Sequence, residues 1–156
     1  MHMTIRRAKP DDVPVIQDCA RKAYCLYVER IGREPAPMVA DFASQVEKGL
    51  IYVIEAGSEV QGYAVCYRRS NLMHLEAVAL FPHWQGRGLG MKLISFVEEL
   101  ARQKGLDGVE LYTNEKMEEN LQYYPRLGFI EKGRKTDDGF NRVYFEKRFT
   151  KRQRQV

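Results

Sequence analysis

The chain has 156 residues, a length that suits one domain with a complete hydrophobic core. Apolar residues make up 44% of it and charged residues 29%, and no apolar run approaches the ~20 residues that span a bilayer. The first residues, MHMTIRRAKPDDV, lack the apolar stretch of a secretory signal, so we expect a cytoplasmic protein with no membrane partner.

Basic residues are concentrated at the end of the chain. Of the 25 Lys and Arg residues, five lie in the last ten positions, and the other 20 fall one short of the 21 acidic residues. We therefore interpret residues 150–156 as a flexible, solvated basic tail after a domain of residues 1–149, and we expect no nucleic-acid partner.

The cysteines and histidines exclude two further kinds of site. Cys19, Cys25 and Cys66 make an odd number with no C-x-x-C pair, and the three histidines are scattered. This pattern predicts neither a disulfide framework nor a metal site, and it is typical of a reducing compartment.

The first third of the chain predicts one strand and two helices. TIRRAK alternates as a strand does. The next helix has Asp11 or Asp12 as its N-cap, Pro14 in its first turn and Gly32 as its C-cap. Its apolar residues recur at steps of three and four: Val13, Ile16, Ala20, Ala23, Tyr27 and Ile31. After the loop REPAP, the segment MVADFASQVEKG predicts a short second helix.

The rest of the chain predicts a sheet with two further helices. Residues 50–81 predict three strands with turns at AGSE and RRSN. A long amphipathic helix follows and ends at Gly105, then the strand GVELYT, and a shorter helix that ends at Gly128. FIEKGRK and NRVYFEKRF predict two antiparallel strands around the turn TDDG. The order β-α-α-β-β-β-α-β-α-β-β predicts one mixed α/β domain.

Three glycines, Gly86, Gly88 and Gly90, stand where the long helix begins. A helix N-terminus presents free backbone N–H groups and the positive end of the helix dipole, so glycines there let an anion approach the backbone. Met91 breaks the dinucleotide pattern G-x-G-x-x-G, and Leu93 after Lys92 breaks the P-loop pattern. A flexible turn without a ligand is the alternative; we favour an anion site.

The segment QGRGLG resembles the Q/R-x-x-G-x-G/A signature of the GCN5-related N-acetyltransferases, the GNAT superfamily. AVALFP resembles the strand-and-proline lead-in of that signature, and YYPRLGF resembles the second signature, Y-x-x-x-G-F. The resemblance covers the chain from Thr4 to about Phe149. It implies a mostly antiparallel central sheet with one parallel, splayed strand pair. Leu80 and Phe81 depart from the usual lead-in, and Met117 stands where the family has an asparagine.

The resemblance implies an acetyl-CoA site with no metal. In the family the glycine loop binds the pyrophosphate, and the lead-in strand pairs with the pantetheine arm as an added strand would. Asn120, one helical turn before Tyr124, is expected to replace the missing asparagine. The charge of Arg87 is expected to help bind the pyrophosphate. The alternative, a solvated arginine, explains this residue nearly as well. The implied cofactor-binding residues are Val78, Ala79, Leu80, Gln85, Gly86, Arg87, Gly88, Leu89, Gly90, Asn120 and Tyr124.

Acetyl transfer to an amine needs a base and an acid. An alkylammonium with a reference pKa near ~10.4 cannot attack a thioester until it loses a proton, and the departing thiolate benefits from a proton donor. The resemblance implies Glu76 as the base, with His74 on the same strand face as the second candidate. It implies Tyr124 as the acid. The alternatives are exposed polar residues at a sheet rim for Glu76 and His74, and a core aromatic for Tyr124.

In this fold the first two helices cover the acceptor side, so Tyr24, Tyr27 and Glu29 are the implied substrate-binding residues; a solvated helix end explains the charges equally well. The predicted function is acetyl transfer from acetyl-CoA to a primary amine of a small molecule or peptide, by direct attack without a cysteine intermediate. The alternative function is a non-catalytic acyl-CoA-binding regulatory domain. The amine is open, and a homodimer is one option for the assembly.

Overall fold

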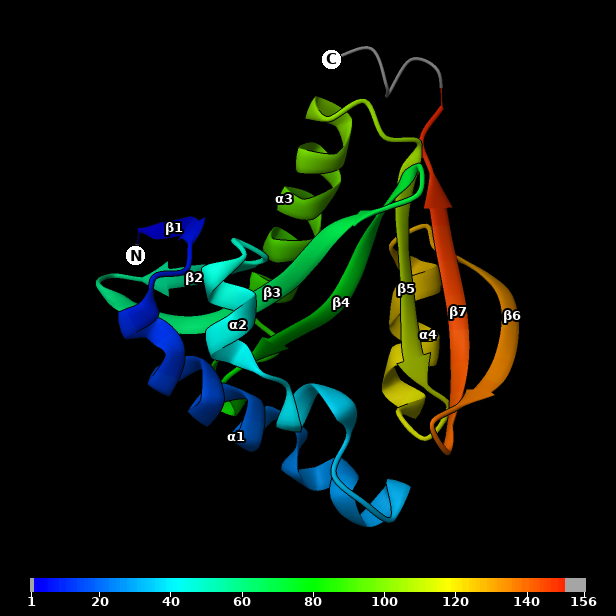
Figure 1. The fold of residues 1–156 in the computed structure, drawn as a ribbon, viewed down its shortest axis with the longest axis horizontal. Helices are drawn as coiled ribbons and strands as arrows, with labels where there is room; N and C mark the ends of the chain where they lie inside the picture. Colours follow the sequence, from blue (N-terminus) through cyan, green and yellow to red (C-terminus); the bar gives the residue numbers. More distant parts are fainter. Residues whose placement is uncertain (1, 151–156) are drawn as a thin grey trace. The chain divides into compact units, whose positions relative to one another are not determined.

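The computed structural model describes residues 2–150, so the predicted basic tail lies outside the described residues except for Thr150. The element order predicted above is confirmed (Figure 1). No helix within residues 2–150 is both long and apolar enough to cross a membrane. The elements are β1 (Met3–Arg7), η1 (Pro10–Asp12), α1 (Val13–Ile31), η2 (Ala36–Val39), α2 (Phe42–Glu47), β2 (Ile51–Ala56), β3 (Glu59–Arg69), β4 (Leu72–Leu80), η3 (Pro82–Trp84), α3 (Leu89–Gln103), β5 (Gly108–Asn114), α4 (Glu118–Arg126), β6 (Ile130–Asp137) and β7 (Phe140–Arg148).

The seven strands follow the hydrogen-bonded order β1-β2-β3-β4-β5-β7-β6. β4 and β5 are parallel, whereas β1–β2, β2–β3, β5–β7 and β6–β7 are antiparallel. This is the mixed, mostly antiparallel sheet that was predicted. The chain forms two compact units: residues 1–66 with 76–96, and residues 67–75 with 97–156. β3, β4 and α3 contribute residues to both units.

In the first unit, α1 begins and ends where the sequence predicts. Asp12 is its N-cap and Gly32, with φ of 89°, its C-cap. However, the Asp12 carboxylate does not cap the helix. It accepts hydrogen bonds from Arg6 Nη1 at 2.8 Å and Nη2 at 3.0 Å, and from the Lys9 backbone N–H at 2.7 Å. These bonds hold the pKa of Asp12 below its usual range.

The predicted second helix is divided into η2 and α2. Ala40 between them is extended, with ψ of 155°, and Asp41 caps α2 by accepting a hydrogen bond from the Ser44 backbone N–H at 3.1 Å. An Asp side chain that bonds a backbone N–H favours a helix start at that point over a continuous helix. The break restricts α2 to six residues.

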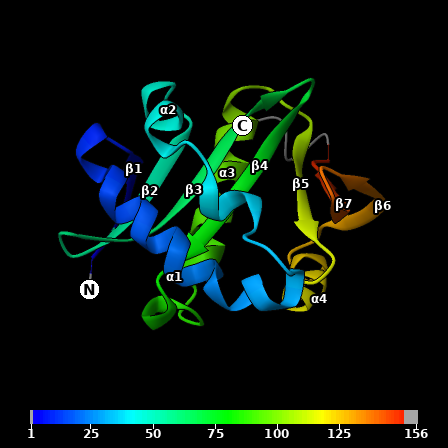
Figure 2. The same ribbon diagram turned by 60° about the horizontal axis from the view of Figure 1, so that its bottom comes forward.

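Helices of the first unit cover both faces of β2 and β3. Tyr63 pairs with Val53, so both side chains share one face, and Tyr52 lies on the other. The Tyr63 ring contacts Phe42 of α2 edge-on at 5.7 Å, and the Tyr52 ring contacts Phe96 of α3 at 5.0 Å. α2 and α3 therefore lie on opposite faces of these strands, as Figure 2 also shows.

The second unit has one apolar and one polar sheet face. Leu111 pairs with Phe145, whose ring lies 5.9 Å from that of Tyr124 in α4, so this face packs against α4. Glu110, one residue before Leu111, lies on the opposite face with His74, its pairing partner in β4. The turn predicted at TDDG is confirmed by positive φ angles at residues 138 and 139.

Candidate active site

The glycine loop lies in the first unit, immediately before α3. Gly86 and Gly88 have φ of 77° and 84°, a conformation that favours glycine, whereas Gly90 is the second residue of the helix. The first hydrogen bond of the helix runs from the Lys92 backbone N–H to the Gly88 carbonyl oxygen at 3.1 Å. The backbone N–H groups before Lys92 belong to the first turn, where an α-helix provides no acceptor for them. A Cβ added at Gly86 or Gly88 would meet no atom within 4 Å. The loop thus presents backbone donors beside open space.

The residues around the loop fix its position. Gln85 Nε2 donates to the Leu80 carbonyl oxygen at 3.2 Å, which ties the loop to the end of β4. The guanidinium carbon of Arg87 lies 4.9 Å from the centre of the Trp84 ring, a cation–π contact. This role of Trp84 was not predicted from the sequence. The available signal was an aromatic residue three positions before an arginine, a spacing at which the two side chains can stack. Gln85 and Arg87, both predicted cofactor residues, therefore also make contacts within the protein.

The lead-in strand β4 is held from two sides. The Tyr24 hydroxyl donates to the Val78 carbonyl oxygen at 3.1 Å. On β3, a Cβ added at Gly62 would lie 2.6 Å from the Ala79 carbonyl oxygen, so glycine allows close approach of the two strands there. Tyr24, predicted as a substrate-binding residue, is thus buried against β4.

The other two predicted substrate residues are more accessible. Tyr27 is half-buried beneath the Arg30 guanidinium, at 5.2 Å from its ring centre, and Glu29 is exposed. These two α1 side chains are therefore better placed than Tyr24 to meet a ligand.

Glu76, the predicted base, is half-buried and has a defined partner. Gln45 Nε2 of α2 donates to Glu76 Oε2 at 2.7 Å. The alternative of an exposed residue at the sheet rim is therefore wrong for Glu76. Gln45 was missed by sequence reasoning, because nothing in a short helix signals contact with a strand thirty residues later.

His74, the second base candidate, is also buried rather than exposed at a rim. Its Nδ1 lies 2.7 Å from Glu110 Oε2, and both residues are at most 6% exposed. The Tyr144 hydroxyl, which lies 2.9 Å from Glu146 Oε2, also lies 3.4 Å from Glu110 Oε1. A histidine in this pair is held in one ring orientation.

Tyr124 and Asn120 lie on α4 in the second unit. Tyr124 is buried, and its ring lies 5.7 Å from Phe129 and 5.9 Å from Phe145. Asn120 Nδ2 donates to Thr113 Oγ1 at 3.1 Å, which ties α4 to β5. Both residues thus take part in packing, and their contacts with a cofactor stay predictions.

The three thiols differ in exposure. Cys19 and Cys66 are buried and Cys25 is exposed. Burial raises the pKa of Cys19 to about 12, so this thiol stays protonated at neutral pH.

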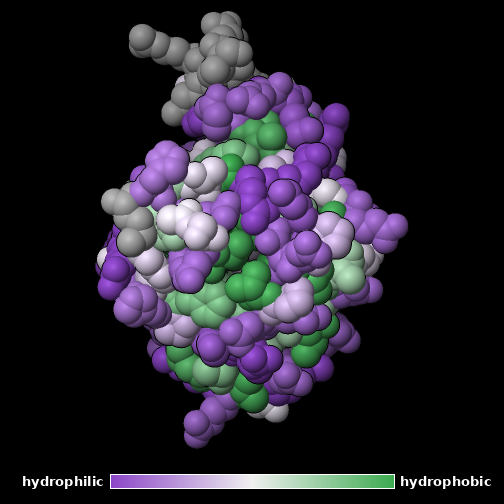
Figure 3. Space-filling view, turned by 90° about the vertical axis from the view of Figure 1, so that its left-hand side faces the viewer, coloured by the Kyte–Doolittle hydropathy of each residue, from purple (hydrophilic) through white to green (hydrophobic). Residues whose placement is uncertain are grey.

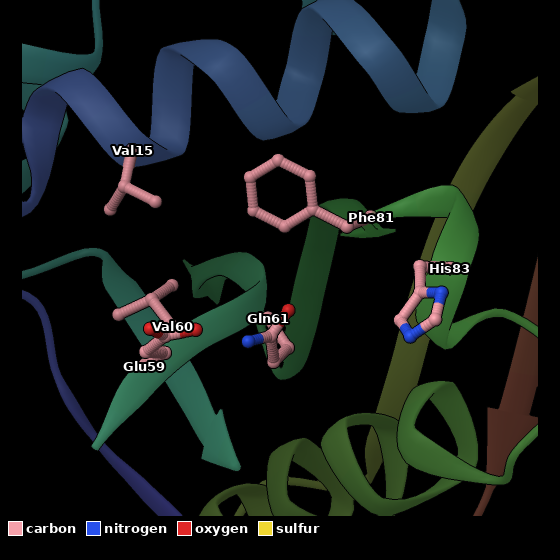
Figure 4. Close-up of a pocket in the computed structure, with 6 residues that line it drawn as sticks. All are labelled: Val15, Glu59, Val60, Gln61, Phe81 and His83. Atoms are coloured by element: carbon pink, nitrogen blue, oxygen red, sulfur yellow. The ribbon is translucent and has the colours of Figure 1, made fainter. Parts of the chain in front are cut away.

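A hollow of about 500 Å³ lies in the first unit, beside the segment that leads into the glycine loop. Figure 4 shows the Phe81 ring beneath α1, with His83 next to it. Figure 3 shows the side of the first unit that carries β1 and the β2–β3 turn, where hydrophobic residues gather between hydrophilic ones. The hollow is lined by Val15, Glu59, Val60, Gln61, Phe81 and His83.

The chain belongs to the acetyltransferase (GNAT) family, whose model matches residues 16–129. It is similar in fold to the PaiA N-acetyltransferase of Thermoplasma acidophilum, solved in complex with coenzyme A. That comparison gives a TM-score of 0.80 at 18% sequence identity and covers 96% of this chain and 100% of the other. The predicted family and fold are confirmed.

Two curated relatives match shorter stretches of sequence. An uncharacterized N-acetyltransferase of Methanocaldococcus jannaschii is 27% identical over 88 residues, 52% of this chain and 39% of the relative. The glucosamine 6-phosphate N-acetyltransferase of Trypanosoma brucei brucei is 41% identical over 56 residues, 36% of each chain. The chain thus spans well under half the length of the curated relatives it matches.

Proposed function

We propose that this chain transfers the acetyl group of acetyl-CoA to a primary amine of a small molecule or peptide, by direct attack. The observation that carries the proposal is the glycine loop, which presents N-terminal backbone donors of α3 beside open space at Gly86 and Gly88. Family membership and the coenzyme A bound to the Thermoplasma relative support acetyl-CoA as the ligand.

Backbone donors from Gly86 to Gly90 hold the pyrophosphate in this proposal, and Arg87 adds its charge. The backbone of Val78, Ala79 and Leu80 pairs with the pantetheine arm. Tyr24 already bonds the Val78 carbonyl, but a carbonyl oxygen has two lone pairs and can accept a second donor. Asn120 contributes from α4.

Glu76 takes the proton of the acceptor ammonium, directly or through water. The freed amine nitrogen then bonds to the acetyl carbon, the carbon–sulfur bond breaks, and Tyr124 gives its proton to the thiolate. The nitrogen loses its second proton as the amide forms, and that proton returns to Tyr124 through water. Tyr27 and Glu29 face the acceptor, where the carboxylate of Glu29 attracts a cation. The high pKa of Cys19 favours direct transfer over a cysteine intermediate.

Two measurements test the proposal in order. A hundredfold excess of CoA over its dissociation constant stabilises the fold by ~2.7 kcal/mol, which raises the melting temperature by roughly 5–10 °C at this size. NAD serves as the control ligand. A shift with NAD and none with millimolar CoA contradicts the acetyl-CoA site.

The second measurement detects free thiol with acetyl-CoA and a panel of amines: polyamines, amino acids, aminoglycosides and peptides with free N-termini. Turnover of any of them supports the enzyme. Binding of CoA without turnover across the panel supports instead a regulatory domain that binds acyl-CoA.

A further inference from the structure

Two buried polar atoms in the first unit have no hydrogen-bond partner within the described part of the chain. They are Gln45 Oε1 on α2 and Tyr63 Oη on β3. Tyr63 is completely buried. Buried polar atoms in folded proteins are nearly always paired with protein or ordered water, so an unpaired acceptor and an unpaired hydroxyl in one unit require a partner.

The chemistry of each atom is fixed by its neighbours. An ionised carboxylate accepts only, so the Gln45 amide must turn Nε2 toward Glu76 Oε2, at 2.7 Å, and Gln45 Oε1 is left as an acceptor. Burial raises the pKa of Tyr63 well above its usual range, and the negative charge of the Glu76 carboxylate acts in the same direction. Tyr63 Oη therefore keeps its proton and is a donor.

The two side chains belong to elements that pack against each other. The Tyr63 ring meets Phe42 at 5.7 Å, and Phe42 is three residues, about one helical turn, before Gln45 on α2. Tyr63 also interacts electrostatically with Glu76, the residue that Gln45 bonds. Through Phe42 and Glu76, Gln45 and Tyr63 thus share both of their neighbours where α2 packs on β3 and β4.

We propose that Gln45 and Tyr63 bind one water molecule beside Glu76 and act as positioning residues for that carboxylate. The water accepts from Tyr63 Oη and donates to Gln45 Oε1 and to the Glu76 carboxylate, the three hydrogen bonds typical of a buried water. The hydrogen bond from Gln45 Nε2 to Glu76 Oε2 fixes the rotamer of Glu76.

The catalytic part rests on the proposed function. There the water is the proton carrier: the acceptor ammonium gives one proton to the water, and the water gives one to Glu76. A cation and an anion become a neutral amine and a neutral acid, with no other reactant.

A high-resolution crystal structure tests the water without any acceptor or turnover. The expected result is one ordered water within about 3.2 Å of both Gln45 Oε1 and Tyr63 Oη. Absence of that water, or a direct hydrogen bond of either atom to another protein group, overturns the proposal. This result is independent of the acetyltransferase assignment.

Tyr63→Phe and Gln45→Met then test the positioning role, since each removes the polar atoms and keeps the shape of the side chain. We expect kcat to fall about tenfold in each, below the ~10²–10⁴-fold that a base itself contributes, with KM for acetyl-CoA changed less than twofold. Tyr52→Phe and Gln17→Met are the matched controls, because Tyr52 lies on the opposite sheet face, where its hydroxyl accepts from Arg7, and Gln17 is exposed.

The melting temperature distinguishes a Tyr63 hydroxyl that is buried without a partner from one that binds the proposed water. An unpaired buried hydroxyl is costly, so its removal would raise the melting temperature and leave kcat unchanged. That combination overturns the proposal. A fall in kcat without stabilisation, together with unchanged controls, supports it.

Discussion

The Tyr24 hydroxyl donates a hydrogen bond to the Val78 carbonyl oxygen across 3.1 Å and so ties α1 to the strand that leads into the glycine loop. Tyr24→Phe removes that bond and keeps the ring. We expect the free energy of unfolding to fall by about 1 kcal/mol, as for a typical buried hydrogen bond, and KM for the amine to stay the same. Urea unfolding and steady-state kinetics measure the two effects.

Tyr123→Phe is the control for this variant, since Tyr123 is half-buried and has no role in the proposed site. A Tyr24→Phe variant with unchanged stability and a raised KM for the amine would show instead that Tyr24 binds substrate directly.

Gly88→Ala should abolish CoA binding at modest cost to the fold. Gly88 has φ of 84° and no atom within 4 Å of an added Cβ, so alanine brings backbone strain of about 1–2 kcal/mol but no clash within the protein. Gly105→Ala is the matched control, with φ of 71° and equally open space at the end of α3. Both variants should lose similar stability in urea, and only Gly88→Ala should lose the CoA-induced thermal shift. Normal CoA binding by Gly88→Ala would show that the loop is a turn and does not bind the cofactor.

Gly90→Ala separates ligand approach from backbone strain. Gly90 lies within α3, where alanine is favoured over glycine by up to about 1 kcal/mol. We expect equal or higher stability together with weaker CoA binding, because the added methyl group enters the space next to the phosphates. Calorimetric titration gives the CoA affinity of Gly90→Ala and of the wild type, and their melting temperatures give the stability. Equal CoA affinity of the two proteins would show that Gly90 does not contact the cofactor.

Tyr124→Phe should lower kcat by about 10²-fold, at the lower end of general acid catalysis because water can partly replace the hydroxyl, and leave CoA affinity nearly unchanged. The ring contacts with Phe129 and Phe145 are kept, so the fold should persist. Tyr123→Phe, the neighbouring half-buried tyrosine, is the control. Full kcat in Tyr124→Phe, with chemistry rate-limiting, would leave Tyr124 a packing residue.

Glu76→Gln keeps the shape of the side chain and removes the base. The rate should fall most at low pH and recover as pH rises, because a larger share of the amine is then already neutral. A pH–rate profile from pH 6 to 10 against wild type measures this. Wild-type rates below pH 7 would place the base elsewhere, and His74→Gln would then be examined in the same way.

Asp12→Asn should destabilise the fold by about 1–3 kcal/mol at pH 7, because Asp12 accepts bonds from Arg6 and from the Lys9 backbone. The pKa of Asp12 is lowered in the folded state, chiefly by Arg6. Its contribution is therefore present above the unfolded value of 3.8 and is lost as pH falls through the folded value.

Urea unfolding of the wild type and of Asp12→Asn at pH 7 and near pH 3 checks this expectation. The difference in their free energies of unfolding should be smaller at the lower pH. Glu131→Gln, which breaks an exposed pair with Arg134, should change little at either pH. A difference that is the same at both pH values would show that the Asp12 charge does not contribute.

The sequence by itself determined the order of the elements, the start of α1 at Asp11 or Asp12, the turns at Gly32, Gly105 and Gly128, and the position of the glycine loop. These features depend on residues close together in the chain: apolar periodicity, caps and positive φ angles. The two short motifs determined the family for the same reason, since each is a local pattern that a ligand or a helix end requires.

Only the tertiary structure decided which partner each polar side chain has. Gln45 reaches Glu76, Tyr24 reaches Val78 and His74 reaches Glu110, over separations of 31 to 54 residues. It also turned the carboxylate of Asp12 from the helix N-terminus to Arg6. A hydrogen bond of this kind depends on how the helices and strands pack, and local pattern carries no information about that packing.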